Sequence, residues 1–412
     1  MSSFSRFART TRSALHGAGS AAVSARGWGW VPLLALTGAG GLLLVALAAA
    51  VARAEDPEAA ATLFWLGLAL LLVPTSCRLL SQRASRTERL GLLLLLTGQT
   101  GLVKPLTGSL RFSYYDEFLH WRTASDIALS GHLLTANPLL PVSPYYPGLE
   151  SVTVALSQLS GLSLFAAGSA VVMAGWAAGI LALFLLYEQI LHSSRVAALG
   201  ALLYMANPAF LFFDRMFSYE SLALPLAILV LLAEARRQAA PRRVRLAWRG
   251  ATLVVLAGAI VTHHISVYAL VAFLFLWTAT YAWFRRRASW RRGPAIVTIV
   301  ALLGALAWVL FVARITLHYL GGNVIVLARQ SLRLFAGEEH ARQLFRSTAA
   351  GAAPAWERMA GYLATLCLVG ALPLGLWRIW RHSRRQALAI ACAAGALAYP
   401  ASLALRFVPI FA

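Results

Sequence analysis

The sequence has few charged residues and few of the groups that stabilise small disulfide-rich or metal-binding folds. Only 12% of its 412 residues are charged and 59% are hydrophobic, whereas soluble domains average about 25% charged residues. The three cysteines, Cys77, Cys367 and Cys392, lie in apolar runs and lack the spacing of a zinc site or a disulfide framework. These shortages exclude an ordinary soluble domain and predict that a lipid bilayer surrounds much of the chain.

Lysine is nearly absent, since Lys104 is the only one, yet the formal net charge is +21. Arginines carry this excess in short clusters between apolar runs. That arrangement indicates membrane topology and argues against a nucleic acid partner. The abundance of arginine, alanine and leucine is typical of a GC-rich, bacterial genome.

Eleven apolar runs are candidates for transmembrane helices, which need about 17 to 25 residues. The first run is too long for the core of a cleaved signal peptide and is predicted to remain as a helix. One run, 250–264, is marginal and is also compatible with a half-helix. The runs are 29–52, 61–77, 90–110, 163–190, 196–213, 218–235, 250–264, 265–284, 294–313, 359–377 and 387–405. The predicted fold class is therefore all-α, a polytopic integral membrane protein with about 11 transmembrane helices.

The charges sort to opposite ends of these runs. With a cytoplasmic N-terminus, 24 of the 36 basic residues fall on the cytoplasmic side, but only Glu88, Glu188 and Glu234 of the 15 carboxylates do. This distribution follows the positive-inside rule and predicts a multi-pass protein of the cell membrane. The predicted segments are a cytoplasmic basic N-terminus (1–28), three transmembrane helices (29–110), an extracytoplasmic loop (111–162), transmembrane helices four to nine (163–313), a second extracytoplasmic loop (314–358) and two last transmembrane helices (359–412).

The first outer loop is predicted to contain two juxtamembrane helices. Residues 112–131 have an amphipathic pattern in which Asp116 and His120 share one face. The stretch 137–148 contains four prolines and cannot be helical, and a short polar-faced helix follows at 148–160. The loop therefore presents ionisable and aromatic side chains at the outer membrane surface.

Two adjacent carboxylates in this loop, Asp116 and Glu117, are candidates for acid–base chemistry. Neighbouring residues on a helix point about 100° apart, so these two cannot face each other like the carboxylates of a glycosidase. One of them is the candidate general base. The alternative is that both are solvated charges that anchor the helix.

Two later junctions between spans also carry polar side chains. Asp214, Arg215 and Glu220 lie at one of them, where ionisable groups need a partner or an aqueous cavity. A simple interfacial ion pair is the alternative for the first two. At the other junction, His263 and His264 are adjacent and do not share a helix face, so they are not a two-ligand metal motif. One of them is a candidate for binding a phosphate or a sugar hydroxyl.

The second outer loop is rich in arginine. Its segment 324–335 is predicted to form a basic surface helix, which could meet anionic headgroups or a lipid-linked phosphate. The chain stops just after the last apolar run, which predicts truncation relative to longer relatives.

The order and common side of these motifs resemble the GT-C superfamily of membrane glycosyltransferases, which includes the protein O-mannosyltransferases and the lipid A aminoarabinose transferase. The resemblance covers roughly residues 90–235. It consists of YDE at 115–117, YYPG at 145–148 and the junction 207–220. The chain departs from the superfamily pattern in having Tyr-Pro-Gly for Tyr-Pro-Pro and Glu220 for an aspartate, and no C-terminal soluble domain follows.

The resemblance implies an inverting glycosyltransferase that moves a sugar from a polyprenyl-phosphate carrier to a glycan, lipid or protein acceptor on the extracytoplasmic face. It implies catalytic roles for Asp116, Glu117 and Glu220, with Asp116 as the base. No metal ligand is assigned, although carboxylates and histidines on one face permit a divalent cation. Substrate-binding roles are predicted for His120, Arg122, Asp126, Tyr145, Tyr146, Asp214, Arg215, His263 and His264.

Two other functions fit the same sequence. A transporter or flippase of a lipid-linked or anionic substrate would place charges within the membrane, and Lys104 in the third span favours it. Snorkelling of that lysine to the interface is the alternative explanation. A catalytically silent assembly subunit is the third hypothesis.

Overall fold

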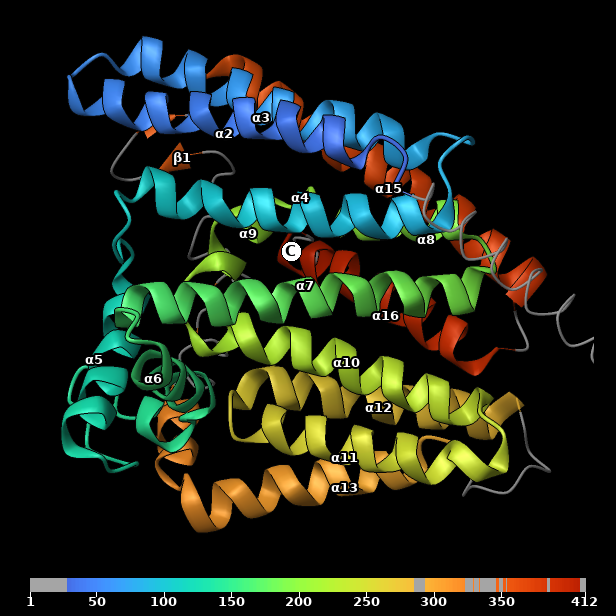
Figure 1. Ribbon diagram of the computed structural model, residues 1–412. Coiled ribbons are helices and arrows are strands. Elements are labelled where there is room, and N and C mark those ends of the chain that lie inside the picture. The colour runs from blue at the N-terminus through green and yellow to red at the C-terminus, as the bar shows by residue number, and fades with distance from the viewer. Residues whose placement is uncertain are drawn as a thin grey trace, which may run out of the picture. The chain divides into compact units, whose positions relative to one another are not determined.

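The computed structural model describes residues 28–284, 293–322, 329, 333, 346–347, 351–352, 354–383 and 386–407. The chain divides into two compact units, Met1–Ala233 and Glu234–Ala412, and each is described by itself. The described residues are largely helical, and the two short strands among them, β1 (Arg346–Ser347) and β2 (Gly351–Ala352), form an antiparallel pair. The predicted all-α class is confirmed (Figure 1).

Unit 1 begins with three long helices, and two shorter ones separate them from a fourth. Its α-helices are α2 (Val31–Arg53), α3 (Pro57–Leu80), α4 (Arg86–Thr107), α5 (Tyr115–Ser130), α6 (Gly148–Ser160), α7 (Leu164–Leu191), α8 (Ser194–Met205), α9 (Pro208–Leu211) and the first part of α10 (Tyr219–Ala239). Two 3-10 turns are η1 (Ser143–Tyr145) and η2 (Phe213–Arg215). The predicted helices of the first outer loop, 112–131 and 148–160, correspond to α5 and α6.

Unit 2 has fewer described elements. They are η3 (Arg242–Val244), α11 (Arg245–Ile260), α12 (His264–Phe284), α13 (Ala295–Ala307), the π-helical turn η5 (Trp308–Val312), the two strands, α15 (Ala355–Ser383) and α16 (Ala387–Phe407). Of the predicted basic helix at 324–335, only Arg329 and Arg333 are described, both as helical, and most of the second outer loop lies outside the described residues.

Short polar side chains start several helices of unit 1. Ser85 Oγ accepts a hydrogen bond from the Glu88 amide at 3.1 Å, and Asp56 Oδ1 accepts one from Ala59 at 3.1 Å. Such caps satisfy amides that have no partner inside the helix. At the other end of α5, Gly131 has φ +71°, a left-handed conformation that glycine adopts without steric cost. Local sequence thus sets where these helices begin and end.

Seven of the described helices are long and apolar enough to cross a membrane: α2, α3, α4, α7, α12, α13 continued through η5, and α15. They make the chain a membrane protein. An eighth crossing results if α8 and the segment Ala209–Arg215 form one span, but these two parts are bent by 77°. The predicted number of 11 crossings is therefore higher than the number of long apolar helices in the described residues.

The remaining predicted spans are helical but differ from a straight apolar crossing. α11 has 16 residues, below the length that a crossing needs. α10 carries Glu220, Glu234, Arg236 and Arg237 along its 21 residues. α16 has 21 residues, and its segment Ala387–Ala398, where side chains are described, is apolar. Hydropathy identified these helices correctly, but bends, buried charges and short lengths do not appear in an average over a window.

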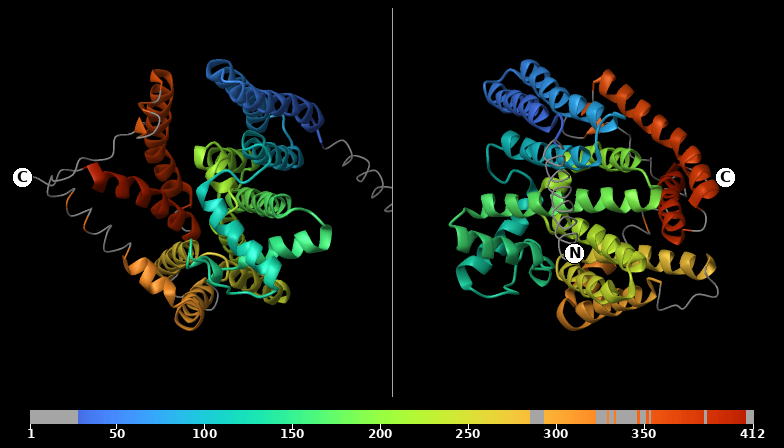
Figure 2. Two further views of the ribbon diagram at one scale, coloured as in Figure 1. Left: turned by 90° about the vertical axis from the view of Figure 1, so that its left-hand side faces the viewer. Right: turned by 45° about the vertical axis from the view of Figure 1, so that its right-hand side comes forward.

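The charges of unit 1 gather at its two ends. At one end, which we call the arginine-rich end, the loops 81–85 and 192–193 meet, because Arg86 forms an ion pair with Glu188 at 2.8 Å and Arg195 Nε donates to the Leu80 carbonyl at 2.7 Å. At the other end, α4 stops and α7 starts, and α5 and α6 lie together there in Figures 1 and 2. We call this second end the α5–α6 end.

Helices α2 and α3 approach each other most closely where two glycines meet. A Cβ atom built on Gly41 would lie 2.7 Å from the Gly67 carbonyl oxygen, and one built on Gly67 would lie 2.7 Å from the Gly41 carbonyl oxygen. Small residues at such crossings let two membrane helices pack backbone against backbone. The close packing of this helix pair therefore depends on these two positions.

Gly41→Ala is expected to destabilise the α2–α3 pair by about 1–3 kcal/mol, because the new methyl group must push backbone atoms apart. Gly40→Ala is the matched control, since its Cβ would meet only the Leu70 side chain at an ordinary 3.6 Å. Both changes raise helix propensity equally, so the difference in stability between the two variants reports the steric effect at the helix crossing alone. Thermal unfolding of the two variants in the same detergent measures it, and equal melting temperatures would contradict the prediction.

Candidate functional site

The first turn of α5 is fixed by the carboxylate of Glu117, which is buried and 1% exposed. Its Oε1 accepts hydrogen bonds from Lys104 Nζ at 2.5 Å and from the Phe217 amide at 3.0 Å. Its Oε2 accepts from the amides of Ser113 at 2.9 Å and Tyr114 at 3.2 Å. Both oxygens are therefore fully used, and Glu117 holds three segments of unit 1 together.

Lys104 is buried with Glu117. Its side chain is 3% exposed, and its Nζ also lies 5.1 Å from the centre of the Tyr114 ring. The snorkelling explanation is therefore wrong, because Glu117 keeps the ammonium group inside the unit. Burial, followed by the nearby Glu117 carboxylate, raises the pKa of the Tyr114 phenol above its ordinary value, so this phenol stays neutral at physiological pH.

Asp116 differs from the adjacent Glu117 in its burial and in its hydrogen bonds. Its side chain is half-buried and makes no hydrogen bond or ion pair with a described residue, and Tyr115 and Phe118 beside it are exposed. The 100° step between adjacent helical residues explains the difference, because only Glu117 can face α4. The predicted base thus keeps a carboxylate that is available to a ligand.

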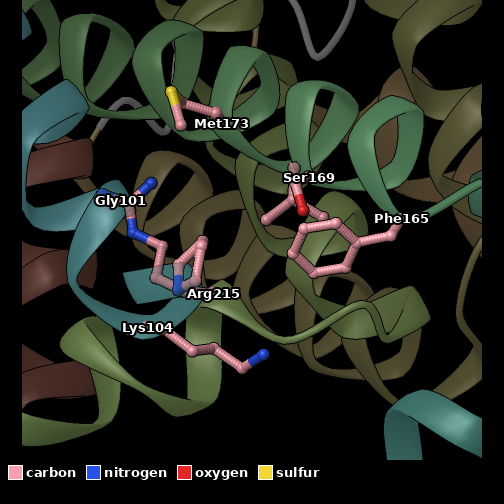
Figure 3. A pocket seen from close by; sticks show the side chains of 8 residues that line it. Gly101, Lys104, Phe165, Ser169, Met173 and Arg215 are labelled. Atoms are coloured by element: carbon pink, nitrogen blue, oxygen red, sulfur yellow. The ribbon is translucent and has the colours of Figure 1, made fainter. Parts of the chain in front are cut away.

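A narrow pocket lies in unit 1 beside the Lys104–Glu117 pair, with room for about one water molecule. Figure 3 shows Lys104 and Arg215 on one side of it, and Phe165, Ser169 and Met173 of α7 on the other. The remaining lining residues are Gly101, Pro105 and Val172.

Arg215 contributes an incompletely satisfied guanidinium to this pocket. The residue is 7% exposed, NH2 donates to the Thr97 carbonyl at 3.1 Å and to Thr100 Oγ1 at 3.3 Å, and the group lies 4.3 Å from the centre of the Phe210 ring. Nε and NH1 are buried and have no hydrogen-bond partner among the described residues, and no described carboxylate forms an ion pair with the group. Buried cations are costly unless an anion or hydrogen-bond acceptors compensate them.

The junction 207–220 carries the other predicted acidic residues. Asp214 Oδ2 accepts a hydrogen bond from Tyr204 Oη at 3.2 Å, and the Asp214 carbonyl accepts one from Trp176 Nε1 at 2.7 Å. Glu220 is half-buried, and its carboxylate makes no hydrogen bond or ion pair with a described residue. Asp214 is therefore held in place by its neighbours, whereas Glu220 remains available.

A buried polar network joins α5 to α6. His120 Nδ1 lies 2.6 Å from Glu150 Oε1, and both side chains are nearly inaccessible. Around this pair, Thr123 and Ser143 share a hydrogen bond at 2.9 Å, and Asn137 Nδ2 donates to Thr123 Oγ1 at 2.9 Å. The network fixes the proline-rich stretch against both helices.

Several other predicted ligands are engaged elsewhere. Arg122 and Asp126 form an i, i+4 ion pair with each other at 2.9 Å, and the arginine side chain is 49% exposed. Tyr146 is 1% exposed and belongs to the core, while Tyr145 is half-buried. The structure brings Asp116, Glu117, His120 and the junction 207–220 together in unit 1, because the Phe217 amide donates to Glu117 and the Tyr219 ring contacts that of His120.

The two adjacent histidines belong to unit 2. His263 Nδ1 shares a hydrogen bond with Ser266 Oγ at 2.9 Å. His264 is 2% exposed, and its ring packs against those of Tyr268 and Tyr319. Both therefore lie in polar and aromatic packing within their own unit. Within the described residues, no group of three His, Cys, Asp or Glu side chains is arranged to hold a metal ion.

Sequence reasoning missed Glu150 and Asn137 and gave Lys104 no partner. A signal existed for the lysine, because it is the only one in the chain and lies one helix before an acidic pair. No comparable signal marked Glu150, since its pairing with His120 depends on how the proline-rich stretch folds back.

Comparison with protein-family models, characterised proteins and solved structures gives no match for this chain. The functional argument therefore rests on the geometry of the site.

Proposed function

We propose that the chain is a membrane glycosyltransferase that moves a sugar from a polyprenyl-phosphate carrier to an acceptor on the extracytoplasmic face. The GT-C resemblance of residues 90–235 led to this hypothesis, and the geometry of unit 1 supports it. The arginine-rich end would face the cytoplasm by the positive-inside rule, so that the α5–α6 end faces outward. The acceptor is a hydroxyl or amine of a glycan, a lipid or a protein.

The chemistry needs two kinds of group. A base must take the proton of the acceptor, and cations must stabilise the phosphate as it departs with the electrons of the glycosidic bond. Asp116 offers the first, and Arg215 offers the second because a phosphate oxygen can accept from the guanidinium nitrogens that lack a partner. Glu220 supplies the further acid of the superfamily pattern.

One observation carries the proposal. An available carboxylate, Asp116, directly precedes Glu117, whose ion-pair partner Lys104 lines a pocket together with the incompletely satisfied Arg215. A base and an anion-binding cation thus belong to one connected set of residues.

Release of the polyprenyl phosphate product tests the proposal without knowledge of the acceptor. Purified protein in vesicles is mixed with a radiolabelled polyprenyl-phosphate sugar and a membrane extract as the acceptor source. Arg215→Gln is expected to raise KM for the donor about 10- to 100-fold, since a charged hydrogen bond contributes about 1.5–3 kcal/mol. Glu220→Gln is expected to slow release.

Arg83→Gln is the matched control, because Arg83 is an exposed arginine at the opposite end of unit 1. We expect it to keep the KM of the native protein. Equal donor KM values for Arg215→Gln and Arg83→Gln would show that the Arg215 guanidinium does not bind the donor.

Transport of a lipid-linked or anionic substrate is the second candidate. It is favoured by the 77° bend between α8 and Ala209–Arg215 and by the burial of Lys104 and Arg215, since transporters bind substrates at broken helices with intramembrane charges. In the same vesicles, movement of the labelled lipid between leaflets without release of polyprenyl phosphate would support transport and contradict transfer.

A further inference from the structure

The histidine of the buried His120–Glu150 pair lies one helical turn after Asp116 on α5. Asp116 precedes His120 by four residues on α5, and such side chains are neighbours on a helix, with Cβ atoms about 5–6 Å apart. Exposure falls along the series, because Asp116 is half-buried, His120 is 2% exposed and Glu150 is 0% exposed. An accessible carboxylate is thus followed by an imidazole and then by an interior carboxylate.

The contact with Glu150 determines which imidazole nitrogen is available. A carboxylate only accepts hydrogen bonds, so His120 Nδ1 carries the hydrogen in its 2.6 Å contact with Glu150 Oε1. Nε2 makes no hydrogen bond with a described residue and is an acceptor in the neutral ring. The Tyr219 ring packs edge-on against the imidazole at 4.3 Å and restricts its rotation.

Glu150 has few hydrogen-bond donors for a buried carboxylate. Its Oε1 has only His120 and a long 3.5 Å contact from Ser143 Oγ, and its Oε2 is buried without a hydrogen-bond partner among the described residues. The nearby Thr153 Oγ1, one turn later on α6, is also buried without such a partner. A buried negative charge in this position is stabilised when the neighbouring imidazole becomes positive.

We propose that Asp116, His120 and Glu150 form a proton relay, an inference that rests on the proposed glycosyl transfer. The acceptor oxygen bonds to the anomeric carbon of the sugar, and the bond from that carbon to the phosphate oxygen breaks with its electron pair on the phosphate. The acceptor proton passes to the Asp116 carboxylate. It then moves to Nε2 of His120, which restores the Asp116 carboxylate, and it leaves to solvent before the next turnover.

The contact with Glu150 gives this second transfer its direction. The Glu150 carboxylate in contact with the ring stabilises a positive charge on the imidazole, and this favours passage of the proton from Asp116 to His120. Glu150 then faces an imidazolium across 2.6 Å and compensates its charge. In this relay, Asp116 is the catalytic residue, while His120 and Glu150 act through it.

Kinetics of the variants test the relay. His120→Gln and Glu150→Gln are each expected to lower kcat for release of polyprenyl phosphate at least about tenfold while KM for the donor stays within about twofold. The double variant is expected to be no slower than His120→Gln, because residues that act as a unit are not additive. His132→Gln is the matched control, since His132 is exposed on the loop after α5.

Nitrogen NMR of histidine-labelled protein gives a readout that does not depend on activity. The side chains in contact with His120 are Glu150 of α6 and Tyr219 of α10, and Asp116 lies one helical turn before it on α5. Asp116→Asn is expected to shift the His120 Nε2 resonance at a fixed pH, because the relay places this nitrogen beside the Asp116 carboxylate. Glu58→Gln, which changes an exposed carboxylate of α3, is expected to leave that resonance unchanged.

The outcomes separate the relay from the proposed function. Normal kcat in His120→Gln, with an inactive Asp116→Asn, would overturn the relay and leave the transferase intact. An unchanged His120 Nε2 resonance in Asp116→Asn would also overturn the relay. Absence of any release by the native protein would overturn the transferase, while this resonance would still decide whether the two side chains interact.

Discussion

Asp116→Asn is expected to slow glycosyl transfer by about 10²- to 10⁴-fold, the contribution that a general base usually makes. The amide keeps the size of the side chain but cannot take a proton. Because Asp116 is half-buried and has no partner among the described residues, its replacement disturbs no packing or hydrogen bond. The measurement is the initial rate of polyprenyl phosphate release from a labelled donor in vesicles.

The matched control for this variant is Glu58→Gln, which also changes a carboxylate of unit 1 into an amide, at an exposed position. We expect both variants to keep the melting temperature of the native protein, and only Asp116→Asn to lose its rate. A normal rate in Asp116→Asn would exclude this carboxylate as the base.

Glu117→Gln, at the next position in the sequence, is expected to affect stability, which Asp116→Asn leaves unchanged, and to lower the free energy of unfolding by about 3–5 kcal/mol. This cost arises because the buried Lys104 ammonium loses its counter-charge, and the same range is expected for Lys104→Met. The free energy of unfolding in mixed micelles measures both. The combined variant Lys104→Met with Glu117→Gln is expected to cost less than the sum, with a coupling of about 0.5–3 kcal/mol.

Arg122→Gln is the control for this second prediction. It removes an ion pair with Asp126 in which the arginine side chain is 49% exposed, and exposed pairs contribute about 0.2–1 kcal/mol. If the unfolding free energy changed equally for Arg122→Gln and Lys104→Met, the Lys104–Glu117 pair would not be the support that its burial indicates.

The positions of helices and the segregation of charge in unit 1 followed from sequence alone. Apolar runs of sufficient length and short polar caps are local properties, so α5 and α6 began and ended close to the predicted residues. The arginines before residue 28 and those at 285–292 and 384–385 lie outside the described residues. Their assignment to one side of the membrane stays a prediction.

The roles of adjacent carboxylates did not follow from sequence. Asp116 and Glu117 have the same chemistry and the same neighbours in the chain, and the fold distinguishes them because only Glu117 faces Lys104 and the Phe217 amide. The same limit applied to Glu150, whose partner His120 is 30 residues away. Pairings across loops depend on tertiary packing, which periodicity does not report.

The hydrogen bond from the Phe217 amide to Glu117 also has a consequence for how the protein is made. Its donor is synthesised 100 residues after its acceptor. While the ribosome is still producing the intervening helices, the carboxylate has Lys104, Ser113 and Tyr114 but not its last donor. Unit 1 therefore completes this contact only after α7 and α8 have been synthesised. Chains that stop before residue 217 would lack the donor that ties the first turn of α5 to the start of α10.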